Sequence, residues 1–294
     1  MPTQTVGAGL LQIDAEQFNA NYNRRPFTFR HKLHEHPLMQ LQALIDLANR
    51  LPADQVRHSR GKRGFDVDFD DDLRVRRHKL TLDEVLTDLQ HADAYVLLHR
   101  PDTDPEYRQL LLSALGDLQL LTDAVDPGMC DEAAYIFVTS PGAVTPYHMD
   151  REVNFHCQIR GWKTYSLWDQ DDRSILSEPE IEQLFAREDL PKPGWKDEYA
   201  AKVMEFELTP GTGVQQPLLA PHAVVVGDEI SIGMALTFRT RSIKRRIAIH
   251  TTNYKLRRLG LKPGAYNQSP LADALKFSAH RGYRALRDLA ARRS

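Results

Sequence analysis

Residues 141–169 read PGAVTPYHMDREVNFHCQIRGWKTYSLWD, and this stretch carries the strongest indication of fold and chemistry in the chain. It places His148 and Asp150 two residues apart at the start of a run with strand character. Side chains at positions i and i+2 of a strand share one face, so an imidazole and a carboxylate at this spacing can converge on one ion. The pair therefore predicts two ligands of a metal site.

A third ligand is expected from a distant strand. Residues 210–240 read PGTGVQQPLLAPHAVVVGDEISIGMALTFRT, and His222 stands there where a β run begins after a Pro-rich loop. Two histidines and one carboxylate on one face of iron leave three positions for cosubstrate and oxygen, which is why non-haem oxygenases use this set. We predict that His148, Asp150 and His222 bind the metal and form the catalytic centre.

The alternation after His148 predicts a ligand cavity. If the strand continues regularly, it separates an inward polar set from an outward apolar set: Asn154, His156 and Gln158 inward, and Phe155, Cys157 and Ile159 outward. A polar inner face is the reverse of a filled barrel core and suits a cavity that holds a ligand. Lys163 opens the next run and can point its ammonium into this cavity, where burial would require an anionic partner.

The surrounding residues, 133–240, favour a β sandwich or barrel, because short β-type runs are broken there by Gly, Pro and Asp. The expected strands are Tyr135–Thr139, Asn154–Ile159, Thr164–Trp168, Glu205–Leu208, Ala223–Val226 and Ser231–Arg239, with one helical insertion at Ser177–Ala186. We expect three parts in the chain: a mixed, largely helical extension (1–132), the barrel (133–240), and a basic segment followed by a C-terminal helix (241–294).

The flanks show helical periodicity. Expected elements are the helices Pro37–Leu51, Thr81–His91, Glu106–Val125 and Pro270–Arg293, a short strand at Tyr95–Leu98, and a solvated surface segment over 57–78. The last helix carries an apolar stripe that something has to cover, so we predict a homodimer formed through it.

The stretch Val144–Lys163 resembles the jumonji-type (JmjC) cupin hydroxylases, in particular the asparaginyl hydroxylase that inhibits hypoxia-inducible factor and its bacterial cupin-like relatives. In that family a threonine three residues before the first iron histidine, an asparagine six after it and a lysine fifteen after it contact 2-oxoglutarate. Thr145, Asn154 and Lys163 stand at those spacings here. Thr237 and Arg239 depart from the hydroxylase, which has a second asparagine and a tryptophan there.

The resemblance implies a mainly β fold, a double-stranded β-helix of the cupin or jelly-roll type, with flanking helices. It implies that Lys163 and Thr145 hold the C5 carboxylate of 2-oxoglutarate, and that Asn154 lies near the C1 carboxylate, in a pocket that Thr237 shares. Fe(II), 2-oxoglutarate and O2 would then support hydroxylation of a protein or peptide side chain, with succinate and carbon dioxide as coproducts. A small-metabolite substrate is the alternative.

Other functions for the same residues remain open. A non-catalytic cupin that binds a metal or ligand would have no need of Lys163, and zinc-dependent hydrolysis would give no role to Thr145 and Lys163 together. His91 and Asp93 repeat the ligand spacing, but at the end of a predicted helix, where residues i and i+2 do not share a face.

Several further residues are interpreted as structural. His31, His34 and His36 are expected on the surface at a helix entry, because no cysteine or carboxylate set accompanies them at metal spacing. His156 is read as a cavity histidine rather than a fourth ligand. Gly211 and Gly213 lie between β runs and are read as a turn.

The composition is that of an ordinary globular protein. The 294 residues carry a formal net charge of -2, with 27% charged and 41% hydrophobic residues, so nucleic acid is not an expected partner. The basic run Arg239–Arg258 is read as solvated surface or an intersubunit contact. The chain shows neither a signal-peptide pattern nor a membrane-length apolar run, and it has only Cys130 and Cys157. We expect a soluble, cytoplasmic protein with reduced cysteines.

Overall fold

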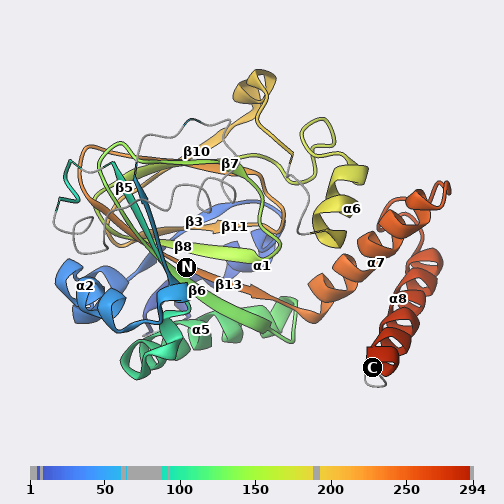
Figure 1. The fold of residues 1–294 in the computed structure, drawn as a ribbon, viewed down its shortest axis with the longest axis horizontal. Coiled ribbons are helices and arrows are strands. Elements are labelled where there is room, and N and C mark those ends of the chain that lie inside the picture. Colours follow the sequence, from blue (N-terminus) through green and yellow to red (C-terminus); the bar gives the residue numbers. More distant parts are fainter. Residues whose placement is uncertain are drawn as a thin grey trace.

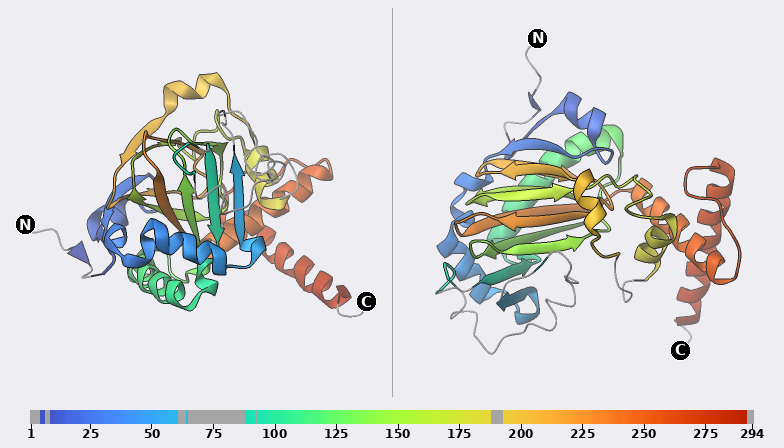
Figure 2. Two further views of the ribbon diagram at one scale, coloured as in Figure 1. Left: turned by 60° about the vertical axis from the view of Figure 1, so that its left-hand side comes forward. Right: turned by 90° about the horizontal axis from the view of Figure 1, so that it is seen from above.

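Two antiparallel sheets face each other in the computed structural model of the chain, which describes residues 5–6, 9–60, 64, 88–91, 93–187 and 193–291 (Figures 1 and 2). The smaller sheet contains, in order, β10 (Met204–Leu208), β9 (Lys163–Leu167), β12 (His222–Val226) and β7 (Val144–His148). The larger sheet runs β1 (Thr5–Val6), β2 (Leu11–Asp14), β3 (Phe27–His31), β11 (Thr212–Gln216), β8 (Val153–Arg160), β13 (Ser231–Arg239), β6 (Cys130–Thr139), β5 (Ala94–His99) and β4 (Val56–Arg60).

The chain crosses repeatedly between these sheets. From β6 to β9 it alternates strictly between the larger and the smaller sheet, and it does so again from β10 to β13. This winding is a double-stranded β-helix, so the predicted fold class is confirmed. Each of the six predicted strands is present, although β6 is longer than expected, and β7 and β11 are strands that the pattern did not predict.

Strands from the first part of the chain extend the larger sheet. β5 pairs with β6, in register Tyr95↔Thr139, and β3 pairs with β11. The prediction of a solvated surface segment over residues 57–78 was wrong for its first residues. Arg57 to Arg60 form part of β4, in which Ser59 is fully buried. The remainder of that segment, apart from residue 64, and most of the predicted helix at 81–91 lie outside the described residues.

Helices α1 (Ala15–Asn21), α2 (Leu41–Arg50) and α5 (Pro105–Val125) pack against the outer face of the larger sheet (Figure 1). α5 follows its predicted span and buries residues that recur at helical spacing: Tyr107, Leu110, Leu111, Ala114, Leu118 and Leu121. They share one hydrophobic core with the outward residues of β8, which are Val153, Phe155, Cys157 and Ile159. The main core therefore lies outside the barrel, and between the sheets a smaller buried cluster that includes Leu167, Val214 and Val224 fills part of the space.

Three helices lie at one end of the barrel. α6 (Glu178–Ala186) begins with a capping box between Ser177 and Glu180. α7 (Arg241–Arg258) and α8 (Pro270–Ala291) form a hairpin that stands away from the sheets (Figure 2). α7 contains most of the basic run and was not predicted as a helix, because its charged residues obscure any apolar stripe. None of the described helices is long and apolar enough to cross a membrane.

Candidate metal centre

Two neighbouring strands bring the candidate histidines together. His148 is the last residue of β7 and His222 the first of β12, and these residues pair directly in the smaller sheet. Their ring centroids are 4.0 Å apart. Asp150 lies in the connection that leaves the smaller sheet after His148 and enters β8 at Val153. The expected continuous strand from His148 was therefore wrong, and a turn between the sheets, not strand alternation, directs the carboxylate toward the imidazoles.

The three side chains are close enough to share one ion. Nε2 of His148 lies 3.9 Å from Oδ1 of Asp150, and Nε2 of His222 lies 3.6 Å from Oδ2. Metal–ligand bonds of about 2.0–2.2 Å let one ion bridge atoms at such separations. Across the described part of the chain, these three residues are the one group of three or more His, Cys, Asp or Glu residues whose candidate ligand atoms all lie within 4.8 Å of one another. The donor set thus fits a divalent transition metal such as Fe(II).

Backbone carbonyls orient both imidazoles for metal binding. Nδ1 of His148 donates to the carbonyl of Pro146 at 2.7 Å, and Nδ1 of His222 lies 3.3 Å from the carbonyl of Ala220. In His148, a proton on Nδ1 leaves the lone pair of Nε2 free for a metal, and Nε2 is the atom that faces Asp150 in both histidines.

Gln216, at the end of β11, connects the ligands to the cavity wall, and sequence reasoning missed it. Its Nε2 donates to Oδ2 of Asp150 at 3.4 Å and lies 3.1 Å from Nδ1 of His222. Its Oε1 accepts from the hydroxyl of Tyr165 at 2.6 Å and from Nδ2 of Asn154 at 3.3 Å. Gln216 belongs to no spacing pattern. Its position just before the Pro-rich loop that leads to His222 was the one feature of the sequence that could have indicated a role in the site.

All seven residues predicted for the site line one cavity of about 230 Å³ between the sheets: Thr145, His148, Asp150, Asn154, Lys163, His222 and Thr237. His156 also lines it, as the alternation in β8 predicted, whereas buried Gln158 instead donates to the carbonyls of Arg160 and Gly161 and to the hydroxyl of Ser231. Aromatic side chains supply much of the remaining wall: Tyr95, Tyr135, Phe137 and Tyr165.

Lys163 is a buried basic residue whose backbone position lies far along the strands from the three candidate metal ligands. It pairs with Val226, four residues beyond His222 on β12. At about 3.3 Å per residue, the two backbone positions are about 13 Å apart. The side chain is 3% exposed, and burial lowers the pKa of its ammonium to about 7. The cavity therefore suits a molecule with an anionic group near each end, one at a metal and one at Lys163.

Three further residues that were predicted to contact the cosubstrate line the same cavity. Thr145 pairs with Val224 in the middle of β12, and its side chain lines the cavity. Asn154 is 4% exposed, and its Oδ1 is buried without a hydrogen-bond partner. Thr237 is 5% exposed and pairs with Asn154 across β13 and β8. An unpaired amide oxygen in the wall is consistent with a ligand or water that completes the site.

Arg239 is not part of the cavity wall. It forms an ion pair with Glu152 and lies 3.6 Å from Asp131. Its Nε donates to the carbonyl of Arg151 at 3.2 Å. Arg239 therefore links the end of β13 to the connection that carries Asp150. Glu152 does line the cavity, and burial raises the pKa of its carboxyl.

The alternative histidines lie outside this centre. His91 is exposed, and its Nδ1 lies 3.1 Å from Asp88. His31 was expected on the surface, but it is 2% exposed at the end of β3, where Nε2 lies 3.1 Å from the carbonyl of Thr212, so that prediction was wrong for this residue. Gly211 has a φ of +82° and precedes β11, as the turn interpretation predicted, whereas Gly213 lies within β11, so that interpretation was wrong for Gly213.

Comparisons with known proteins give the family and the fold. The chain matches the cupin-like domain family over residues 15–242. Among solved structures, Escherichia coli ycfD is similar at 14% identity and a TM-score of 0.51, over 88% of this chain and 62% of that one. The Escherichia coli ribosomal oxygenase YcfD in complex with cobalt and 2-oxoglutarate is similar at 15% identity and a TM-score of 0.51, over 89% and 61%.

The chain thus spans about three fifths of the length of these structural relatives. At this level of identity the likeness shows a shared fold. No curated protein sequence matches the chain significantly.

Proposed function

Because the chain belongs to the cupin-like domain family, we propose that it is an Fe(II)- and 2-oxoglutarate-dependent dioxygenase that hydroxylates its substrate. The observation that carries the proposal is the cavity that His148, Asp150 and His222 share with the buried cation of Lys163. When bound there, iron supplies oxygen activation, which couples decarboxylation of 2-oxoglutarate to succinate with hydroxylation of a C–H bond.

The protein's own residues bind and orient the cosubstrate in this proposal. Lys163 pairs with its C5 carboxylate, and the hydroxyl of Thr145 donates to the same group. Asn154 and Thr237 lie at the C1 end, near the metal ligands. Aromatic and aliphatic walls exclude water, which strengthens the pairing of Lys163 with an anion. The cobalt and 2-oxoglutarate in the YcfD complex support this assignment by analogy.

We propose a protein or peptide side chain as the primary substrate. The cavity of about 230 Å³ is smaller than the roughly 300–1,000 Å³ of pockets that enclose a drug-sized ligand. Once a dicarboxylate occupies it, the remaining space suits one side chain rather than a whole second metabolite. The description of YcfD as a ribosomal oxygenase supports the same class. A small metabolite remains the second candidate.

The decisive experiment is anaerobic loading with Fe(II), followed by addition of 2-oxoglutarate and O2 and measurement of succinate. We expect slow succinate formation that an extract fraction containing the substrate accelerates. The Asp150→Ala variant serves as the control for activity that does not depend on the site. Binding of metal and 2-oxoglutarate without any succinate would favour a regulatory cupin instead.

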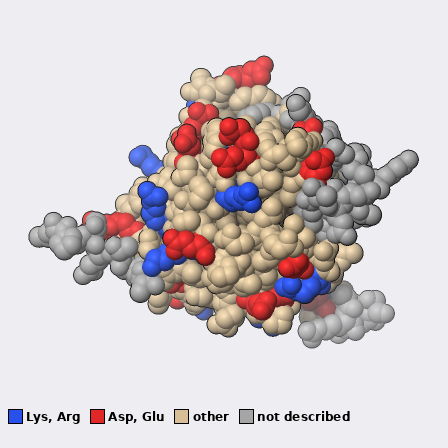
Figure 3. Space-filling model, turned by 90° about the vertical axis from the view of Figure 1, so that its left-hand side faces the viewer, with Lys and Arg blue, Asp and Glu red and all other residues tan. Residues whose placement is uncertain are grey.

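In the part of the chain that the structure describes, the face of the barrel remote from α7 and α8 offers no basic surface for nucleic acid. On the face drawn in Figure 3, acidic and basic side chains are interspersed, with no continuous basic stripe among the described residues. The basic run was interpreted as solvated surface or an intersubunit contact, and Arg241, Lys255 and Arg258 are indeed exposed. Other basic residues of α7 are engaged within the chain. Arg246 is half-buried and lies over the Tyr266 ring, Arg257 pairs with Glu182, and Lys244 pairs with Asp131.

We further propose that the protein is a homodimer in the cytoplasm. On α8, Leu271, Leu275, Leu286 and Leu289 recur at helical spacing and are 55–73% exposed. A second copy of α8 offers a matching apolar surface, which supports a symmetric contact. The cytoplasmic location is supported by the two cysteines, which are both free.

A further inference from the structure

Lys163 and His156 form a buried pair inside the cavity. Nζ of Lys163 lies 3.3 Å from Nε2 of His156, and the residues are 3% and 5% exposed. An ammonium group has hydrogen atoms to donate and no lone pair to accept, so Nε2 of the imidazole accepts this bond. The ring proton of His156 is then on Nδ1.

The barrel makes room for this pair at a specific place. Gly233, on β13, lies directly beside it: a Cβ at this position would be 2.8 Å from Nζ of Lys163 and 2.8 Å from Nε2 of His156. The imidazole is further enclosed by Phe137 and Tyr165, whose ring centroids lie 6.0 and 5.1 Å from its own. The orientation of the imidazole toward Lys163 is therefore set by the surrounding strands.

We infer that His156 is a positioning residue for cosubstrate binding, whose Nε2 holds the protonated Lys163 where the ammonium meets the distal carboxylate of 2-oxoglutarate. This inference rests on the proposed function. It assigns to His156 a role besides that of a passive cavity histidine, and one that does not require it to bind the metal.

Lys163 needs such a partner because a buried ammonium is costly. Desolvation disfavours the charged form of Lys163, and a neutral acceptor partly restores what water provided. His156 stays neutral because burial, with the charge of Lys163 adding to it, holds its pKa well below the ordinary range. An ammonium has three hydrogens, so one can bond to His156 while two remain for a carboxylate. The other titratable groups on the cavity wall are Arg57, Tyr95, His99, Tyr135, His148, Asp150, Glu152, Tyr165 and His222.

The test compares His156→Phe, which keeps a ring but has no acceptor, with His156→Gln, whose carbonyl can accept from Lys163. 2-Oxoglutarate is titrated calorimetrically into the Mn(II)-loaded proteins from about pH 6 to about pH 9, around the range in which the lysine titrates. Near-UV circular dichroism and a separate Mn(II) titration check that the fold and metal site are intact.

We expect His156→Phe to bind 2-oxoglutarate roughly tenfold to a hundredfold more weakly at neutral pH, the effect of losing a hydrogen bond to a charged group. Its affinity should also begin to fall at a lower pH than in wild type, because the ammonium is lost earlier. His156→Gln should recover most of the affinity and the original pH profile. A structural role alone would leave the pH profile unchanged.

The outcomes separate the inference from the function on which it rests. If wild-type protein binds 2-oxoglutarate and folded His156→Phe binds it equally at every pH, the inference fails and the proposed function stands. If wild-type protein binds no 2-oxoglutarate, both fail. Gly233→Ala is an independent variant, because its methyl group would displace the pair. It should weaken 2-oxoglutarate binding while Mn(II) binding persists, and an unchanged affinity would count against the inference.

Discussion

At the residue scale, the metal centre depends on a small set of directed contacts. The carbonyls of Pro146 and Ala220 orient the two imidazoles, and the amide of Gln216 connects Asp150 to the cavity wall. Such contacts hold donor atoms close together before an ion arrives, which reduces the cost of assembling the site. Replacing a ligand is therefore expected to affect metal binding far more than folding.

Asp150→Ala should lose most Fe(II) affinity, because it removes the one carboxylate of the three-residue donor set. The loss should be about tenfold to a hundredfold or more, at least as large as the loss caused by removing an outer-shell partner of a metal ligand. Calorimetric titration with Mn(II), or with Fe(II) under anaerobic conditions, measures it. His91→Ala is the matched control and should bind like wild type. Equal binding by Asp150→Ala and wild type would contradict the assignment.

Lys163→Ala should retain metal binding and lose cosubstrate binding, because it leaves an anion in the cavity without its main partner. Breaking a buried charge pair costs about 3–5 kcal/mol, which corresponds to at least a hundredfold in affinity. Titration of 2-oxoglutarate against the Mn(II) form measures the loss. Lys163→Arg should recover only part, since a planar guanidinium differs in shape and reach. An unchanged affinity in Lys163→Ala would favour a regulatory cupin.

The pH dependence of cosubstrate affinity follows from the same lysine. The pKa of Lys163 is about 7 in the free protein, and a bound anion raises it. Affinity should therefore be nearly constant below about pH 7 and should fall as the pH rises above it, until the pKa of the complex is reached.

At the element scale, the connection between β7 and β8 and the packing of α6 on α7 determine how the site is supported. Thr251 on α7 donates to the carbonyl of Phe185 in α6 at 3.5 Å, and Arg151, the neighbour of Asp150, donates to the carbonyl of Leu184 at 2.5 Å. α6 therefore lies between the metal-binding connection and the C-terminal helices.

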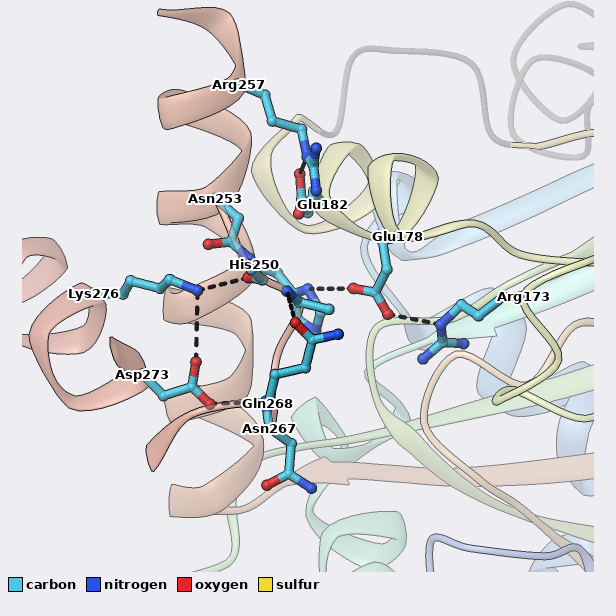
Figure 4. A network of polar contacts seen from close by, with 12 residues as sticks. Arg173, Glu178, Glu182, His250, Asn253, Arg257, Asn267, Gln268, Asp273 and Lys276 are labelled. Atoms are coloured by element: carbon cyan, nitrogen blue, oxygen red, sulfur yellow. Dashed lines mark hydrogen bonds and ion pairs between the residues drawn. The ribbon is translucent and has the colours of Figure 1, made fainter. Parts of the chain in front are cut away.

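A polar network joins α6 to α7 and α8 (Figure 4). One of its ion pairs joins Glu182, which is fully buried, to Arg257, whose Nε donates to Oε2 of Glu182 at 2.6 Å. Around it, Arg173 pairs with Glu178, and Lys276 lies 3.7 Å from Asp273. Buried charges of this kind depend on their partners.

Arg257→Ala should destabilise the protein by about 3 kcal/mol, because it leaves the carboxylate of Glu182 buried and unpaired. The estimate is at the low end of the usual range, since the side chain of Arg257 is 32% exposed. Urea unfolding followed by circular dichroism measures the change. The double variant Glu182→Leu with Arg257→Ala should be more stable than the single variant. A single variant as stable as wild type would show that the pair contributes little.

At the scale of the whole molecule, the α7–α8 hairpin extends away from the barrel and leaves one side of α8 exposed (Figure 2). Its other side contacts α7, where Asp273 is buried. These leucines are exposed in the single chain, and in the proposed homodimer the second copy of α8 would cover them. The two barrels would then lie at a distance from the contact.

Substituting Leu275 and Leu286 together by lysine should produce a monomer, because charges replace the centre of the apolar face. We expect the dimer dissociation constant to rise more than tenfold, roughly the effect of losing two apolar contacts. Sedimentation equilibrium measures it. Leu259→Lys, at a position 76% exposed outside α8, is the control and should remain dimeric. A wild-type chain that sediments as a monomer would contradict the proposal.

The amino-acid sequence by itself determined most of the strands of the core and the helices α5, α6 and α8. These follow from local periodicity and capping, which depend on residues close together in the chain. The β-helix fold class was implied by the resemblance to the JmjC hydroxylases. Seven residues that were predicted for the site line the cavity. The metal ligands were predicted from residue type and spacing, whereas Thr145 and Thr237 were implied by the resemblance alone.

Tertiary structure alone decided the pairing of β3, β4 and β5 with the larger sheet, the turn that brings Asp150 to the histidines, and the position of Gln216. It also decided that Arg257 would meet a buried carboxylate and that His156 would accept a hydrogen bond from Lys163. The physical reason is that these contacts join residues from different strands and helices. A local pattern specifies which face a side chain takes, whereas its partner depends on how distant elements pack.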